Sequence, residues 1–311
     1  MKNTFNIIII LLMSVLGMSC SGNRQSKPDP VSHEVGIAYM NLETGEVLAY
    51  NAQTMFHAAS TMKTPVMLQL FRMRDRGVID LNNRVLVSNQ FTSIADGSLF
   101  SLPIHSEADK ILYPSLGKFL SYSELIEKMI TKSSNLATNI LFEYARADSI
   151  SKTMREIGAS GILVMRGVED LNAYRIGLNN VTSAYGMMKV MEAVYRSELV
   201  ADSSRQEMQE ILKRQAYNKM IPAGLPQDVV VAHKTGSITR IAHDAALVFP
   251  PDAAPFVLVI LTRGWDDQGE AQRVGARITT EVYDYHLGKL DRTDIVIPDL
   301  LEQVSPSTEA P

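Results

Sequence analysis

The order of apolar and polar residues predicts strands at the start of the chain. Residues 34–42 and 46–51 are two apolar stretches on either side of Glu43-Thr44-Gly45. Alternation on both sides of a glycine-containing turn is typical of a β-hairpin.

Late in the chain the same kind of pattern returns. Three short β-rich runs, bounded by Gly, Pro and Asp, cover residues 228–236, 243–251 and 256–265. They predict a second group of antiparallel strands, and residues 268–288 predict a helix after them.

Between the two groups of strands, apolar residues recur at helical spacing. The first helical segment, Ser60–Gly77, ends in a glycine, which is a natural C-terminal cap. Residues 85–112 show no clear period and predict a long loop. Further segments, several opened by Ser, Thr or Asp, predict helices over 121–130, 135–147, 149–158, 182–197 and 203–214.

These elements predict one α/β (α+β) fold. The simplest closure places all five strands in one antiparallel sheet flanked by helices, with the helical block as an all-α insertion. The α/β part then comprises residues 34–59 and 223–290, the all-α part comprises 60–222, and 34–290 form one catalytic domain. No internal repeat is present in the sequence.

The composition fits a globular protein and gives no sign of a nucleic-acid partner. The chain has 311 residues, of which 46% are hydrophobic and 21% charged, with a formal net charge of -4. No run of five or six like charges appears. The histidines show no ligand spacing such as His-x-x-x-His, so no metal or other cofactor is implied.

The N-terminus predicts export. Lys2 precedes a short apolar run that ends in small residues and in Cys20, the single cysteine. The sequence "LGMSC" resembles a bacterial lipoprotein signal, so we expect cleavage after residue 19, lipid on Cys20 and a periplasmic, membrane-anchored location. A plain signal peptide or an uncleaved anchor is the alternative. Residues 1–20 are then the signal, 21–33 a tether and 291–311 a flexible tail.

Ser60 and Lys63 are the first candidate catalytic pair. A serine hydroxyl needs a neighbouring base to act as a nucleophile, and side chains three residues apart share one face of a helix. The alternative is a helix cap beside a surface lysine. Roughly one Ser-x-x-Lys is expected by chance in a chain of this length, and Ser115–Lys118 is a second example.

Two further motifs carry polar chemistry. Ser133 and Asn135 flank Ser134 between two predicted helices and offer a hydroxyl and an amide, although both residue types are also common helix caps. Lys234-Thr235-Gly236 lies on a predicted strand. Its lysine and threonine can bind a carboxylate and its glycine admits a substrate, but a turn at the end of a strand would also use these residues.

In this order and on this layout, the three motifs resemble those of the serine β-lactamases and penicillin-binding proteins, and the class A β-lactamases most of all. The resemblance covers about residues 35–288 and implies the fold of that family. It implies β-lactam breakdown, and hence antibiotic resistance, through an acyl-enzyme on Ser60.

The resemblance also implies a role for each residue of the motifs. Lys63 would activate Ser60, and Ser133 would pass a proton to the leaving nitrogen. Substrate would be bound by Asn135, Lys234, Thr235 and Gly236, and the backbone N–H groups of Ser60 and Ser237 would form the oxyanion hole. Arg240 and His243 are further candidates for holding the substrate carboxylate.

This sequence departs from the class A pattern in the segment that supplies the deacylating water. The family has a glutamate there, with an arginine two residues before it and an asparagine four after it. Arg166, Glu169 and Asn172 have the right types at spacings of three and three. Glu169 is the candidate base, Asp170 is a stand-in, and Asn172 is a substrate-binding candidate. The alternative is that both carboxylates are solvated.

Three further departures accompany this one. Ser134 replaces the usual aspartate of the middle motif, and the gap from Lys63 to Ser133 is longer than in the family. Asn180 stands where an aspartate usually closes the loop against the arginine. A buried ion pair with Arg166 would therefore become a hydrogen bond at best.

Three functions remain open from the sequence. The first is a serine β-lactamase. The second is a D-alanyl-D-alanine peptidase or esterase with slow β-lactam turnover. The third is a non-catalytic binding domain. The expected partner is a small-molecule β-lactam or a peptidoglycan-type D-Ala-D-Ala substrate. The lipid is the only expected membrane contact, and a monomer is expected.

Overall fold

The computed structural model describes residues 32–104 and 110–295. Cys20, the predicted signal and most of the predicted tether lie outside these residues, as does the predicted tail after residue 295. In the described part of the chain, no helix is both long and apolar enough to cross a membrane.

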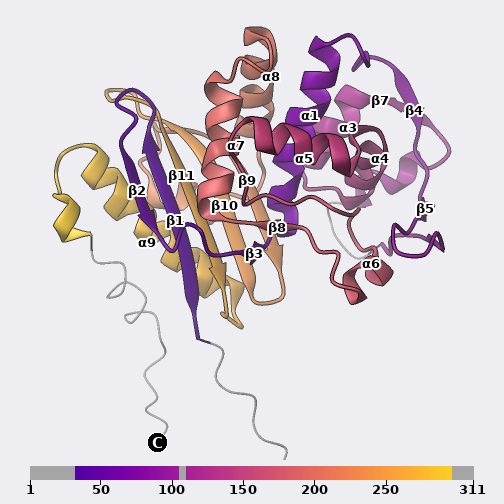
Figure 1. Cartoon of the computed structure of the whole chain (residues 1–311). Coiled ribbons are helices and arrows are strands. Elements are labelled where there is room, and N and C mark those ends of the chain that lie inside the picture. The colour runs from indigo at the N-terminus through magenta and orange to yellow at the C-terminus, as the bar shows by residue number, and fades with distance from the viewer. Residues whose placement is uncertain (1–31, 105–109, 296–311) are drawn as a thin grey trace, which may run out of the picture. The chain divides into compact units, whose positions relative to one another are not determined.

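One five-stranded antiparallel sheet is the centre of the fold, with strand order β2-β1-β11-β10-β9 (Figure 1). The predicted early hairpin and the three predicted late strands are both confirmed. Their bounds are β1 Glu34–Asn41, β2 Val47–Tyr50, β9 Val230–Ile238, β10 Ile241–Phe249 and β11 Phe256–Arg263. Strand β9 is last in the order, so it is an edge strand of the described sheet, and it carries Lys234-Thr235-Gly236.

The two faces of the sheet bury two different sets of side chains. In β1, Ile37 and Tyr39 pack in one apolar cluster with α9 (Gln268–His286), whereas Ala38 and Met40 pack in the other with the remaining helices. The alternation follows from the period of two in a strand. The sheet is therefore a middle layer with helices on both sides.

The helical block lies between β1–β2 and β9–β11 in the sequence, as predicted. Helix α7 packs on β1 and β11, so the block shares its core with the sheet. The bounds are α1 Lys63–Asp75, α3 Tyr122–Thr131, α4 Asn135–Ala145, α5 Ala147–Glu156, α6 Leu171–Arg175, α7 Ala184–Arg196 and α8 Asp202–Lys213.

Short pieces complete the described chain. The predicted long loop holds parts of two small sheets, β4 with β7 and β5 with β6, and residues 105–109 of it are outside the described part. The short strands are β3 Phe56–His57, β4 Arg84–Leu86, β5 Phe91–Thr92, β6 Leu99–Phe100, β7 Phe119–Ser121 and β8 Val181–Thr182. The 3-10 turns are η1 Ala59–Met62, η2 Tyr113–Ser115, η3 Pro222–Gly224 and η4 Arg292–Asp294.

Local chemistry explains the helix ends. Ser121 and Glu124 form a reciprocal capping box at the start of α3, with Ser121 Oγ 3.1 Å from the Glu124 N–H. Gly77 follows α1 with a φ of +69°, which an L side chain rarely adopts, so the predicted glycine cap is confirmed. Pro65 is the third residue of α1, where the backbone N–H has no partner within the helix.

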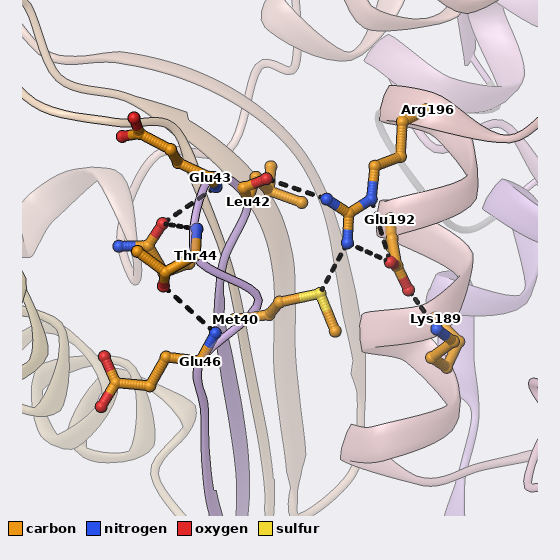
Figure 2. Close-up of polar contacts among 9 residues, drawn as sticks. Met40, Leu42, Glu43, Thr44, Glu46, Lys189, Glu192 and Arg196 are labelled. Carbon is orange, nitrogen blue, oxygen red and sulfur yellow. Dashed lines mark hydrogen bonds and ion pairs between the residues drawn. The ribbon is translucent and has the colours of Figure 1, made fainter.

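Helix α7 is tied to the turn between β1 and β2 (Figure 2). Arg196 in its last turn donates to the carbonyl of Leu42 at 2.8 Å, and its guanidinium lies 3.8 Å from Met40 Sδ. The Glu192 carboxylate lies between Arg196 and Lys189 and pairs with both. The contact joins the helical block to the turn that connects β1 and β2.

Candidate active site

Ser60 is on η1, one turn before α1 begins at Lys63. The sequence predicts a single helix from Ser60, and the structure instead has a 3-10 turn that continues into the α-helix. The serine is partly exposed, whereas Lys63 is completely buried. Ser60 is therefore accessible to a substrate, and the lysine behind it is shielded from water.

Lys63 is bound to the second motif. Its Nζ donates to the Ser133 carbonyl at 2.7 Å, to Asn135 Oδ1 at 2.9 Å and to Ser133 Oγ at 3.2 Å. The contacts join residues about 70 positions apart in the chain, so the two motifs meet through the fold rather than through local sequence.

The second motif is the corner between α3 and α4, as predicted. Ser133 has a φ of +58°, an uncommon conformation for a residue with a side chain. Ser134 caps α4 by accepting the Ala137 N–H at 3.2 Å, and Asn135 is the first residue of that helix. The cap therefore belongs to the middle residue, where the family has aspartate, and leaves the two outer side chains to point elsewhere.

Lys234 approaches Ser133 from the other side. Its Nζ donates to Ser133 Oγ at 3.2 Å and to the Thr235 carbonyl at 2.7 Å, and its side chain is completely buried on β9. Burial lowers the pKa of Lys234 from its usual value of 10.5 to about 7, against the opposing effect of the Asp244 carboxylate. The Ser133 hydroxyl thus lies between two lysines.

Gly236 permits the close packing of β9 against η1. A Cβ at this position would lie 3.1 Å from the Ser60 nitrogen and 3.0 Å from the Thr61 nitrogen. The backbone N–H of Ser60 and the end of β9 are consequently side by side. This is the placement that the expected oxyanion hole of Ser60 and Ser237 needs.

A cavity of about 560 Å³ opens in front of these groups. Four segments form it: η1, the corner before α4, residues 216–220, and β9 with the neighbouring ends of β10 and α9. Its lining includes Ser60, Ser133, Asn135, Tyr217, Asn218, Lys219, Met220, Thr235, Ser237, His243, Gln268 and Gln272. Among the described residues, no aspartate or glutamate lines it.

Both candidates for an extra carboxylate-binding cation are engaged elsewhere. His243 is buried, accepts the Thr262 N–H at 3.0 Å and contacts the His57 carbonyl at 3.0 Å. Burial lowers the pKa of His243 to about 4, so the ring is neutral near pH 7. Arg240 pairs with Asp266 at 2.9 Å.

The part of the predicted water-activating segment that holds Arg166, Glu169 and Asn172 lies beside the β5–β6 hairpin. Glu169 is partly buried with a φ of +60°, and it is absent from the residues that line the cavity. Asp170 is buried and caps α6, where it accepts from Ser93 Oγ at 2.7 Å. Asn172 donates to Asp96 at 3.0 Å, toward the hairpin turn. The two predicted loop carboxylates thus have different environments.

Arg166 and Asn180 close the loop through the backbone. Asn180 Oδ1 accepts from the N–H groups of Met165 and Arg166 at 2.8 and 3.1 Å, and its Nδ2 donates to the Arg166 carbonyl at 2.9 Å. The guanidinium of Arg166 donates to the Gly167 carbonyl at 3.0 Å and lies over the ring of Tyr174. Hydrogen bonds therefore stand where the family has an ion pair.

Val168 occupies the position that the family pattern gives to the base. It is two residues after Arg166 and four before Asn172. The Asn139 amide fixes its backbone from both sides, with Oδ1 accepting the Val168 N–H at 2.6 Å and Nδ2 donating to its carbonyl at 2.9 Å. Counting from Arg166 and from Asn172 together would have found this residue in the sequence.

Two charged residues of the site were missed by sequence reasoning. Lys219 is exposed and is the one lysine or arginine among the described lining residues of the cavity. Asp244 is completely buried one strand away from Lys234. Neither belongs to a motif, and no pattern in one sequence singles them out.

Comparison with known proteins agrees with this architecture. The model of the "Beta-lactamase enzyme family" matches residues 29–286. The β-lactamase of Streptomyces fradiae is 24% identical over 245 residues, 74% of this chain and 74% of that protein.

Solved structures are similar over most of their length. The structure of PBP-A is 25% identical and covers 81% of this chain and 91% of that chain, with a TM-score of 0.69. A mutant of PBP-A, solved as an acyl-enzyme complex with penicillin G, is 26% identical, covers 83% and 92%, and has a TM-score of 0.68. With the match of the family model over most of the chain, these similarities show that the protein belongs to the β-lactamase enzyme family.

Proposed function

We propose that this protein is a serine enzyme of the penicillin-binding type, which β-lactams acylate at Ser60 and which releases the acyl group slowly. Its ordinary substrate would be a peptide ending in D-Ala-D-Ala. The observation that carries the proposal is Val168 at the position of the family's base, together with a cavity whose described lining has no carboxylate.

The residues around Ser60 support the acylation step. Ser60 Oγ forms a bond to the carbonyl carbon of the substrate while the carbon–nitrogen bond breaks. The proton of Ser60 passes to Lys63, and Ser133, 3.2 Å from Lys63 Nζ, delivers a proton to the leaving nitrogen. Two buried lysines on one hydroxyl favour this transfer, because each can hold or yield a proton.

Release of the acyl group has less support. Water must attack the ester carbon, and a general base normally removes its proton. The valine side chain at position 168 cannot accept a proton. When a β-lactam ring opens, the leaving nitrogen stays attached to the acyl group. Without a general base for water, this acyl group would therefore persist on Ser60. The solved acyl-enzyme of the PBP-A mutant with penicillin G is consistent with acylation by β-lactams on this fold.

A second candidate is a β-lactamase with Glu169 as the base. Glu169 directly follows Val168, and its φ of +60° turns the chain at that point. The relative from Streptomyces fradiae is named a β-lactamase, which favours this candidate. Export through Cys20 is part of both candidates and stays a prediction.

One experiment separates the candidates. Purified residues 21–311 are incubated with a chromogenic cephalosporin, and colour and intact mass are followed together. We expect one equivalent of colour and a lasting adduct, which peptide mapping places on Ser60, and no adduct with Ser60→Ala. Rapid multiple turnover without an adduct would establish the β-lactamase instead.

Two loop variants locate the base. Val168→Glu should raise the deacylation rate at least about tenfold, because it places a general base at the family position. Glu169→Ala should leave the lifetime of the adduct unchanged. A longer lifetime in Glu169→Ala would show that Glu169 is the base and would contradict the proposal.

A further inference from the structure

A buried carboxylate lies behind the cavity, and nothing in the resemblance gives it a role. Asp244 on β10 is completely buried. Its Oδ1 is 2.9 Å from His233 Nδ1, and its Oδ2 accepts the Ile221 N–H at 3.1 Å. His233 Nε2 is in turn 3.0 Å from Asn218 Oδ1. The carboxylate is thus linked by two routes to residues 218–221.

The same carboxylate lies on the strand next to that of Lys234. Successive side chains of a strand point to opposite faces of the sheet, so Asp244 acts on Lys234 through its charge and not through a contact. In the antiparallel pair of β9 and β10, Asp244 is opposite Thr235, the residue next to Lys234 in the chain. The hydrogen-bond partners of Lys234 Nζ, Ser133 Oγ and the Thr235 carbonyl, are both uncharged. Asp244 is the described carboxylate whose charge favours a protonated Lys234.

Other charged groups around Lys234 act differently. From α1, Lys63 shares the Ser133 hydroxyl with it. On β10, His243 is neutral near pH 7 because burial lowers its pKa to about 4. His233, on β9 itself, is bound to Asp244. The balance between burial and Asp244 therefore decides whether Lys234 carries a charge.

We propose that Asp244 and His233 form a buried positioning pair that keeps Lys234 protonated and fixes the cavity wall at residues 218–221. The inference rests on the proposed function and deepens it, because it concerns the same cavity. Asp244 acts on the charge of Lys234, and His233 transmits its position to Asn218, which lines the cavity. Both residues act through others and touch no substrate.

The charge is tested without substrate. Protein labelled with ¹³C,¹⁵N-lysine is titrated by NMR, with the Lys234 signal assigned from Lys234→Arg. We expect Lys234 in Asp244→Asn to titrate at least about one pH unit lower than in the wild type. Asp244→Glu, which keeps the charge, should restore most of the shift. Equal midpoints in wild type and Asp244→Asn would overturn the proposal.

The same variants are then compared in acylation by penicillin G between pH 5 and 9. Lys234 loses its charge as the pH rises through its pKa, so the wild-type rate constant should fall above about pH 7. In Asp244→Asn this fall should begin at lower pH. A wild type that is never acylated would refute the proposed function, whereas the NMR midpoints would still test the positioning pair.

His233→Gln separates the two parts of the proposal. It should weaken penicillin binding about tenfold before acylation, because Asn218 loses its anchor, while the Lys234 midpoint does not fall. Unchanged penicillin binding in a folded His233→Gln variant would refute the proposal that His233 fixes the cavity wall. The matched control is Asp252→Asn, an exposed aspartate in the turn after β10, which should change neither readout. If Asp244→Asn does not fold, Asp244→Ser takes its place.

Discussion

A side chain added at Gly236 would meet the neighbouring backbone directly. The Ser60 and Thr61 nitrogens would lie 3.0–3.1 Å from a Cβ, and both belong to a turn that is packed between β9 and α1.

We therefore expect Gly236→Ala to push β9 away from η1. Acylation by penicillin G should fall at least about tenfold, because a small displacement of the oxyanion-hole donors loses most of their effect. Stopped-flow acylation measures this. Val230→Ala, at the exposed other end of the same strand, is the control, and an unchanged rate in Gly236→Ala would show that the two backbones adjust freely.

Lys234 should make stability depend on pH. Burial holds its pKa at about 7 in the folded protein against 10.5 normally. Between these values the unfolded chain binds one proton more, so the free energy of unfolding rises with pH. Relative to Lys234→Met, the wild type should gain roughly 1 kcal/mol per pH unit above pH 7. Urea unfolding at pH 6, 7, 8 and 9 measures the difference, and a constant difference would contradict the low pKa.

At the scale of single residues, the sequence predicts the polar groups that sit in motifs. Ser60, Ser133 and Lys234 can be found because their types and order are specific, and the structure brings them together. Val168 can be found only by counting from Arg166 and from Asn172 together, because a valine in a loop looks ordinary by its type. Asp244 cannot be found, because an aspartate in a strand looks ordinary until its neighbours are known. Whether Glu169 acts as a base stays a prediction.

At the scale of elements, the periodic pattern of apolar residues predicts the long strands and helices. It does not predict the short turns and strands between them. The five strands and the main helices follow from periods of two and of 3.6 residues. The 3-10 turn that carries Ser60 and the small sheet of β4 and β7 have no periodic signal, since each segment is only three or four residues long. Packing against the sheet and the helices, rather than local preference, determines these pieces.

Arg196 lets the contribution of one contact between elements be measured. We expect Arg196→Ala to lower the free energy of unfolding by about 1 kcal/mol, because the bond to the Leu42 carbonyl is lost and the exposed ion pair with Glu192 contributes little. Acylation should be unchanged. Urea unfolding is the measurement, and Arg155→Ala, also in the last turn of a helix, should have a smaller effect.

At the scale of the whole molecule, two helical layers enclose one sheet, and the cavity opens where the edge strand β9 meets the helical block. The sequence predicts this arrangement through the order of its elements. It does not predict which charges face the cavity, because residues 216–220 reach it only through the packing of the folded chain. That packing places Lys219 at the cavity.

Lys219 should select substrates that carry a negative charge. We expect Lys219→Met to lower acylation by penicillin G about three- to tenfold, and to leave acylation by a neutral penicillin ester nearly unchanged. Higher salt should weaken the wild-type preference. Lys152→Met on α5 is the control, and equal losses for both substrates would show that Lys219 does not read charge.

The Ser133 hydroxyl is held by Lys63, 70 positions before it, and by Lys234, 101 positions after it. Only a part of the chain that spans residues 63–234 contains all three groups. A fluorescent penicillin would therefore mark only molecules that have completed folding, and would ignore partly folded ones. The nucleophile thus doubles as an internal reporter of conformational integrity, usable in refolding, proteolysis or crude extracts without an added tag.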